Sequence, residues 1–220
     1  MSEIKTQYFR DRSFQVVKGS THPEYSFATF DTEEKDFREK YWDIKENDVV
    51  FDIGASYGAY TLAACSMGAI VYTFEPEKSV YCDLVNNVNV NNWSSRCLTQ
   101  NVGLWDSITL VDMKEYAPHW PSQTITSDYA VITIDEMVKN NNIQKINWMK
   151  IDVEGAEVHV VRGGLNSINK FLPKLIIECH TFLNPNFMPD IKELLKDNYS
   201  FEEVNRDPCD MLIAIPKGTV

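Results

Sequence analysis

The chain has 220 residues, of which 44% are hydrophobic, and this is enough for one domain with a substantial core. A formal net charge of −11 without any cluster of lysine and arginine argues against a nucleic-acid backbone as the substrate. The cysteines are scattered without C-x-x-C spacing, no apolar signal run follows the N-terminus, and no segment is long enough to span a bilayer. We therefore expect a cytoplasmic protein whose partner is a small or uncharged molecule.

The first elements expected along the chain are an arm, a helix and a buried strand. Residues 1–30 are mixed and aromatic and predict an arm packed on the main domain. The D-x-x-E pattern of Asp31–Glu34 then predicts the start of a short charged helix that reaches about Trp42. The near-continuous apolar run Val49–Ile53 predicts a strand that is buried on both faces.

Helices and strands are expected to alternate after this strand. A small-residue helix over 59–67 precedes a second buried strand over 70–75. Apolar residues keep helical spacing between 80 and 88, and a third strand is expected over 97–104. Residues 106–132 interrupt the alternation and are expected to form an inserted hairpin and loop.

A second capping box, Thr133–Glu136, predicts a helix to about residue 141. The remaining elements expected are buried strands over 146–152 and 174–179, a helical segment over about 157–170 between them, a short helix around 191–195, and a hairpin formed by 201–204 and 211–215.

Alternating strands and helices with short connections indicate parallel, right-handed βαβ units with helices on both faces. The fold class predicted is α/β, a Rossmann-like, doubly wound, seven-stranded and mostly parallel sheet with an antiparallel C-terminal hairpin. We expect one domain over residues 1–220, in which 1–45 form the N-terminal arm and helix and 106–132 form the insertion.

The stretch DIGASYGAY, Asp52–Tyr60, admits three interpretations. It satisfies the G-x-S-x-G nucleophile elbow, it nearly satisfies the dinucleotide fingerprint, and it suits the loop on which S-adenosylmethionine rests in methyltransferases. The elbow is disfavoured because this loop follows the first strand of the sheet, before the strands that build an oxyanion hole.

Glu75 favours an adenosine ligand, since it ends the second strand 21 residues after Gly54 and can accept both hydroxyl protons of a ribose. Ser56 stands where the middle glycine of a dinucleotide site lets the backbone approach a pyrophosphate, and Asp52 would repel one. S-adenosylmethionine has no pyrophosphate and carries an ammonium and a sulfonium, so it is favoured over a nicotinamide cofactor.

Four segments carry a resemblance to a known family: VVFDIGASYGAYTLAACSMGAIVYTFEP, TIDEM, MKIDVEGAEVHVVRGG and PKLIIECH. Together they resemble the FkbM family of S-adenosylmethionine-dependent methyltransferases from about Val49 to His180, and Lys150–Glu157 is the most specific part. Ser56 departs from the asparagine expected there, but it is small and polar and therefore compatible with the cofactor. The resemblance implies methylation of oxygen on sugars or secondary metabolites.

The resemblance also implies which residues bind the cofactor. Those along its methionine part are Asp52, Gly54, Ala55, Ser56 and Gly58. Those around its adenosine part are Glu75 at the ribose and Pro76, Asn101 and Val102 near the adenine. Asp152 ends the fourth strand at the carboxyl edge of the sheet, where ligands bind in open α/β folds.

Methyl transfer to a hydroxyl usually needs a base for the acceptor's proton, and Asp152, Glu154 and His180 are the candidates. We predict His180 and Glu154 as the catalytic residues and assign Asp152 to the cofactor. The alternative is a structural role for each residue. His180 would be a strand-end histidine bonded to backbone, and Glu154 would be a carboxylate facing a helix N-terminus. An Asp–Glu–His set also suits a metal, but the sequence gives no ligand geometry, so none is predicted.

Aromatic residues in 113–129 and 181–189 suit a sugar face or a flat metabolite, or else fix these loops to the core. The acceptor is therefore a small molecule or glycan, with a sugar hydroxyl preferred over a lipid or secondary metabolite. A module that binds the cofactor and transfers nothing is the alternative outside enzymes. A homodimer through the arm or the insertion is compatible with the sequence.

Overall fold

The computed structural model describes residues 3–19, 30, 33–112, 128–206 and 209–218. The chain divides into two compact units, residues 1–101 and 102–220. Within the described residues, no helix combines the length and the apolar character needed to cross a membrane.

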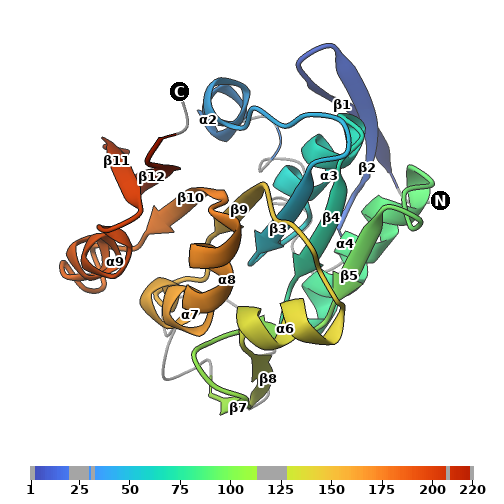
Figure 1. Ribbon diagram of the computed structural model, residues 1–220. Coiled ribbons are helices and arrows are strands. Elements are labelled where there is room, and N and C mark those ends of the chain that lie inside the picture. The colour runs from blue at the N-terminus through green and yellow to red at the C-terminus, as the bar shows by residue number, and fades with distance from the viewer. Residues whose placement is uncertain (1–2, 20–29, 31–32, 113–127, 207–208, 219–220) are drawn as a thin grey trace. The chain divides into compact units, whose positions relative to one another are not determined.

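The first unit contains a parallel part of the sheet covered by helices (Figure 1). Its strands are β3 (Val49–Ile53), β4 (Ile70–Phe74) and β5 (Cys97–Gln100), and its helices here are α3 (Ala59–Ser66) and α4 (Lys78–Val90). β4 pairs in parallel with β3 on one side and with β5 on the other. All five residues of β3 are buried, as its unbroken apolar pattern predicts.

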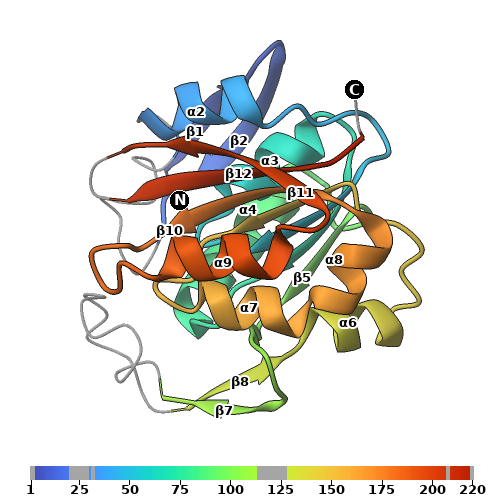
Figure 2. The same cartoon turned by 60° about the vertical axis from the view of Figure 1, so that its left-hand side comes forward.

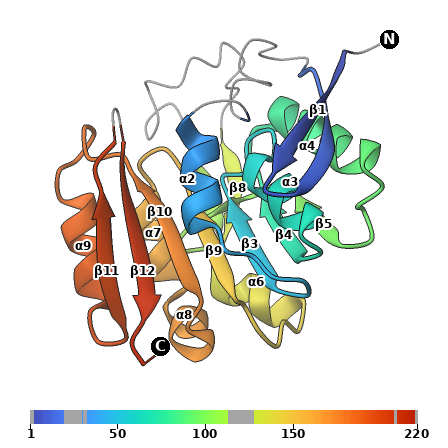
Figure 3. The ribbon, with the colours of Figure 1, turned by 90° about the horizontal axis from the view of Figure 1, so that it is seen from above.

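An N-terminal hairpin, formed by β1 (Ile4–Phe9) and β2 (Arg12–Val17), was not predicted from the sequence. β2 lies along α3 and α4 (Figure 3). Side chains of α4 and of its C-cap bind the outer edge of β2. The C-cap Asn91 accepts from Gln15 N and donates to Gln15 O, both at 2.7 Å, and Asn87 Oδ1 on α4 accepts from Val17 N at 2.8 Å. These amides replace a third strand and close an edge that would otherwise be open to pairing.

Helix α2 (Glu33–Tyr41) follows the hairpin. It lies where a helix is expected, but Asp31 and Thr32, the first residues of the predicted capping box, are outside the described residues.

The second unit contains a mixed part of the sheet (Figure 2). Its strands are β9 (Trp148–Ile151), β10 (Lys174–Cys179), β11 (Tyr199–Val204) and β12 (Asp210–Pro216). β9 and β10 are parallel, whereas β12 runs antiparallel between β10 and β11. The predicted antiparallel hairpin at the C-terminal end is therefore present.

The helical segment predicted over 157–170 is two helices. They are α7 (Glu157–Gly163) and α8 (Leu165–Phe171), and α9 (Phe187–Leu195) packs against α7. The break falls at Gly164, which approaches Ile134 so closely that an added Cβ would lie 2.7 Å from its Cδ1. A side chain at Gly163 would meet the carbonyl oxygen of Trp105 at 1.9 Å. Close packing at this pair of glycines therefore leaves no room for a side chain at the end of α7.

The strand predicted over 97–104 is also divided. β5 ends at Gln100, and β6 (Gly103–Leu104) belongs to a separate three-stranded sheet with β7 (Thr109–Val111) and β8 (Tyr129–Ile132). The chain leaves β5 at Asn101, whose side chain donates to the carbonyls of Glu75 and Pro76 at 2.9 Å each and so holds the turn. β7 and β8 are antiparallel.

Helix α6 (Ile134–Asn140) begins as the second capping box predicts, since Thr133 Oγ1 accepts from Glu136 N at 3.0 Å. β3, β4, β5, β9, β10, β11 and β12 make up a seven-stranded mixed sheet. The predicted Rossmann-like α/β fold class is confirmed.

Candidate functional site

The loop after β3 has a backbone that requires small residues. Gly54, Ser56 and Gly58 all have positive φ, at 75°, 50° and 93°. Gly54 N and Ala55 N both donate to Phe74 O at 3.0 Å, so the end of β4 fixes the shape of the loop. These contacts turn the loop sharply over the end of the sheet before α3 begins.

Glu75 is buried beside this loop and binds it through backbone groups. Its Oε2 accepts from Ser56 N at 2.9 Å, and its Oε1 accepts from Glu77 N at 2.9 Å. Asn101 joins the same group through the carbonyls of Glu75 and Pro76. Glu75, Pro76 and Asn101, which the sequence assigns to the adenosine part of a cofactor, therefore lie together. Val102, the fourth residue with this assignment, is half-buried at the start of the second unit.

Asp52 is fully buried on β3. Its Oδ2 accepts from Thr61 Oγ1 at 2.6 Å, and this hydroxyl is also 2.9 Å from Thr73 Oγ1. Hydroxyls of α3 and β4 thus orient the carboxylate, and sequence reasoning missed both of them. The sequence offered a signal for Thr61 alone, because it is the one aliphatic hydroxyl among residues 59–65 of α3.

A second loop, after β9, brings the predicted base candidates together in the second unit. His180 follows β10 and is 2% exposed. Its Nε2 is 3.1 Å from Glu154 Oε2 and 3.9 Å from Asp152 Oδ1. Asp152 is in turn paired with the buried Lys150, whose Nζ lies 2.6 Å from Oδ2.

Glu157 completes this cluster and was missed. It is the first residue of α7, it is fully buried, and its Oε1 accepts from Gly155 N at 3.0 Å and from His180 Nδ1 at 2.7 Å. A carboxylate at Nδ1 fixes the orientation of an imidazole and the nitrogen that carries its proton. The signal was present in the E-G-A-E spacing, but only the first glutamate was considered.

The cluster changes the acid–base behaviour of His180. Burial lowers the pKa of the ring, but hydrogen bonds to Glu154 and Glu157 and the charge of Asp152 outweigh it and raise the pKa from 6.5 to about 11. The imidazole therefore keeps its second proton at neutral pH while these carboxylates are charged. It can accept a proton only when their charge is offset.

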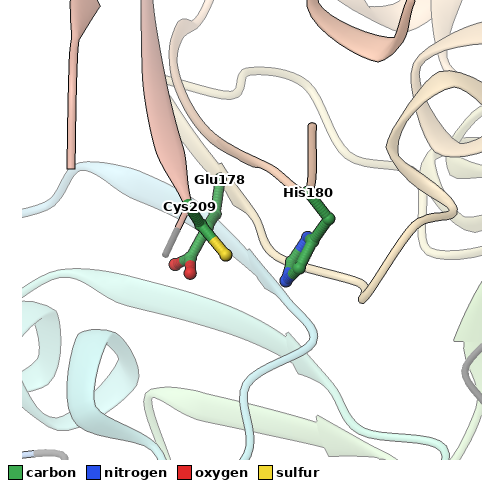
Figure 4. A group of neighbouring side chains, drawn as sticks. All are labelled: Glu178, His180 and Cys209. Carbon is green, nitrogen blue, oxygen red and sulfur yellow. The ribbon is translucent and has the colours of Figure 1, made fainter. Parts of the chain in front are cut away.

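Glu178 and Cys209 form a second group with His180, with one potential ligand atom from each residue within 4.8 Å of the others (Figure 4). Burial and the nearby Glu178 carboxylate raise the pKa of the Cys209 thiol well above its ordinary value. Cys209 is therefore an unreactive thiol at neutral pH.

The aromatic residues expected to meet the acceptor are placed only in part. Residues 113–127 lie outside the described residues. Phe182 is 55% exposed, and its ring lies edge-on to His180 with the centroids 5.8 Å apart. Phe187 begins α9.

The sequence profile of the methyltransferase FkbM domain matches residues 52–203, which is more than half of the chain. The chain belongs to the FkbM methyltransferase family. The matched residues of this FkbM chain include the loop with Gly54, Glu75, and the cluster around His180.

Comparisons with individual proteins agree with this family. Hexuronic acid methyltransferase AglP of Haloferax volcanii is 27% identical over 169 residues, which are 74% of this chain and 69% of AglP. The crystal structure of an FkbM methyltransferase from Methylobacillus flagellatus KT matches with a TM-score of 0.60 at 17% identity. That match covers 89% of this chain but 56% of the other, so this FkbM chain spans little more than half of that protein.

A second crystal structure, precorrin-6y C5,15-methyltransferase from Geobacter metallireducens GS-15, has a TM-score of 0.52 at 10% identity. The match covers 79% of this chain and 82% of that one. At such low identities, both crystal structures show that the fold is shared.

Proposed function

We propose that this FkbM-family chain transfers the methyl group of S-adenosylmethionine to a sugar hydroxyl. The observation that supports the cofactor most is the contact between Glu75 and Ser56 N. It joins a buried carboxylate at the end of β4 to the backbone of the glycine-containing loop after β3, as expected where an adenosine ribose binds at the carboxyl ends of neighbouring parallel strands. The side chain of Ser56 argues against a pyrophosphate at the same loop.

The proposed acceptor is a hydroxyl of an acidic sugar, either free or within a glycan. The support is the name of the Haloferax volcanii relative, which is a hexuronic acid methyltransferase. A hydroxyl is weakly nucleophilic until its proton is removed, so an enzyme of this kind needs acid–base groups beside the acceptor.

In the proposed reaction the acceptor oxygen attacks the methyl carbon in line with the sulfur. The bond between methyl and sulfur breaks, S-adenosylhomocysteine leaves, and the hydroxyl proton is lost to a base or to water. Alignment of the reactants can supply about 7–11 kcal/mol, and a positioned base adds about 10²–10⁴-fold. We assign the proton-handling role to His180 and Glu154, and contact with the cofactor to Asp152.

The first test is calorimetric titration of the chain with S-adenosylhomocysteine, with NADH in a parallel cell. We expect micromolar binding of S-adenosylhomocysteine and no binding of NADH. The reverse result would refute the assignment of the cofactor.

The acceptor is tested next by incubating the chain and S-adenosylmethionine with glucuronic acid, its oligosaccharides and their neutral glucose counterparts. Mass spectrometry should detect a product that is one CH₂ unit heavier, formed faster from the acidic acceptors. Cofactor binding without methylation of any sugar, but with methylation of a lipid or a phenolic metabolite, would move the acceptor to another class.

A further inference from the structure

The cluster around His180 has the donor atoms and spacing of a cation site. Asp152, Glu154 and His180 each offer one ligand atom, and these atoms all lie within 4.8 Å of one another. Ligands bound at about 2.1 Å around one ion are separated by roughly 3.0–3.4 Å when they are neighbours. The separation of 3.1 Å between His180 Nε2 and Glu154 Oε2 already falls in this range, and the 3.9 Å to Asp152 Oδ1 needs only a small movement.

Buried groups that are not ligands orient two of these donors. A histidine that binds a metal almost always donates its other ring N–H to a carboxylate, a carbonyl or water. Here that partner is Glu157, which is fully buried and is itself fixed by Gly155 N. Lys150, 4% exposed, holds one oxygen of Asp152, so the other oxygen is the one that lies toward His180. Surface acidic clusters lack this buried support.

Glu157 provides an independent observation. Its Oε2 is buried and has no hydrogen-bond partner among the residues that the structure describes. A buried carboxylate is costly unless its charge is compensated, and an unsatisfied buried oxygen often indicates a water or an ion that belongs nearby. The carboxylates of Asp152, Glu154 and Glu157 lie around one lysine and one imidazole, so a doubly charged cation would neutralise the group.

We infer that Asp152, Glu154 and His180 bind one divalent cation that accepts both carboxylate and imidazole ligands, as Mn²⁺ does. The carboxylate side chains of Asp152 and Glu154 are 25% and 28% exposed. The ion would therefore be reachable from solvent and would keep coordination positions for water or for an acceptor oxygen. This differs from the sequence-based expectation of no metal.

The role of the cation rests on the proposed function. A cation lowers the pKa of an oxygen that it binds, as it does for water. The acceptor hydroxyl would lose its proton to solvent, its oxygen would form the bond to the methyl carbon, and the electron pair of the broken bond would remain on sulfur. Deprotonation would then not require His180 to act as the base, because its Nε2 would be bound to the cation.

Glu178 and Cys209 define the competing site, since they share His180 with this one (Figure 4). That set contains a sulfur ligand, which favours zinc over manganese. The contact of Nδ1 with Glu157 leaves Nε2 as the ligand nitrogen, and Nε2 lies toward Glu154 and Asp152. This orientation favours the oxygen-rich set.

The test is titration of the full chain with Mn²⁺ after removal of metals by a chelator, with the electron paramagnetic resonance signal of free Mn²⁺ as the readout. We expect one ion per chain with micromolar Kd. Glu154→Gln, which keeps the shape of the side chain, should weaken binding at least 10-fold, and Glu157→Gln should weaken it about 10- to 100-fold by disturbing the orientation of His180. The matched controls Glu178→Gln and Cys209→Ser should bind Mn²⁺ like the unmodified chain.

S-adenosylhomocysteine affinity is measured in the same preparations and should not change in any of these variants. Saturable Mn²⁺ binding without S-adenosylhomocysteine binding would support the cation site and refute the proposed function. The inference is overturned if neither Mn²⁺ nor Zn²⁺ binds saturably, or if Cys209→Ser abolishes binding while Glu154→Gln retains it. Thermal unfolding followed by circular dichroism verifies that each variant is folded. If Glu157→Gln does not fold, Glu154→Gln still tests the site, because Glu154 is only half-buried.

Discussion

The loop after β3, residues 54–58, and the loop after β9, residues 152–155, use the same backbone device. Each leaves a buried strand, and each contains a residue other than glycine in the left-handed region, Ser56 with φ of 50° and Glu154 with φ of 56°. Each also donates a backbone N–H to a buried carboxylate, which is Glu75 for the first loop and Glu157 for the second.

The two loops differ in the other contacts that the buried carboxylate makes. Both oxygens of Glu75 accept from backbone N–H groups, those of Ser56 and Glu77. Glu157 instead reaches His180, which in turn meets Glu154 and Asp152. Residues 54–58 carry no charged side chain and form the neutral loop, whereas residues 152–155 include Asp152 and Glu154 and form the charged loop. Similar turns therefore place very different side chains beside a buried carboxylate.

The largest expected effect tests the charged loop. His180→Ala should lower kcat about 10²–10⁴-fold, because it removes the group that we propose handles the acceptor's proton, directly or as a cation ligand. S-adenosylhomocysteine affinity, measured by calorimetry, should stay nearly unchanged. His159→Ala is the control, since that ring stacks on Trp105 and lies 2.6 Å from Asp106 instead of joining the cluster. Full turnover in His180→Ala would leave the histidine a purely structural role.

The next effect tests the neutral loop. Glu75→Ala should weaken S-adenosylhomocysteine binding about 100-fold or more, since hydrogen bonds to a charged group contribute about 1.5–3 kcal/mol each and the ribose would lose two. Glu77→Ala is the matched control. Glu77 caps α4 through Ser79, so its loss should cost about 1 kcal/mol of stability without lowering the affinity for S-adenosylhomocysteine. Equal affinities in the two variants would refute the ribose assignment.

A third variant tests how the neutral loop is supported. The buried side chain of Asn87 accepts from Val17 N and donates to Tyr57 O at 2.9 Å. Asn87→Ala leaves two backbone groups unpaired and should lower the free energy of unfolding by about 2–4 kcal/mol, measured by urea denaturation. Asn86→Ala, at an exposed position of the same helix, should change it by less than about 0.5 kcal/mol. Similar losses in both variants would show that the buried contacts are not the cause.

The smallest effect compares the strain in the two loops. A left-handed conformation costs a residue other than glycine about 1–2 kcal/mol, so Ser56→Gly and Glu154→Gly should each raise the free energy of unfolding by up to about 1 kcal/mol. The methyltransferase activities of the two variants should differ. Ser56→Gly keeps the backbone donor to Glu75, whereas Glu154→Gly loses a carboxylate beside His180. Loss of stability in either variant would mean that the side chain contributes more than the strain costs.

The neutral loop could be predicted from the sequence because its determinants are local. Gly54, Gly58 and Glu75 occur at the ends of two strands whose apolar runs are unbroken, and parallel strands bring such ends to one edge. The start of the helix after Thr133 could be predicted equally well, because a capping box is recognised from four consecutive residues.

Features that depend on distant side chains could not be predicted in this way. The role of Glu157 exists only because His180, 23 residues further along, comes to lie beside it. The N-terminal hairpin is held by Asn87 and Asn91, about 70 residues away, and nothing in residues 1–20 identifies these partners. The cytoplasmic location, the homodimer, the single domain over 1–220 and the roles of the individual site residues stay predictions.

Asn87 also links two parts of the first unit energetically. One amide holds β2 at Val17 and the loop at Tyr57, so a ligand that stiffens the loop also lowers the frequency with which the hairpin edge opens. By reciprocity, loosening the hairpin weakens binding of the ligand to the loop by the same coupling free energy. The amide proton of Val17 is thus a remote reporter, and its exchange with solvent deuterium should slow when the loop is occupied.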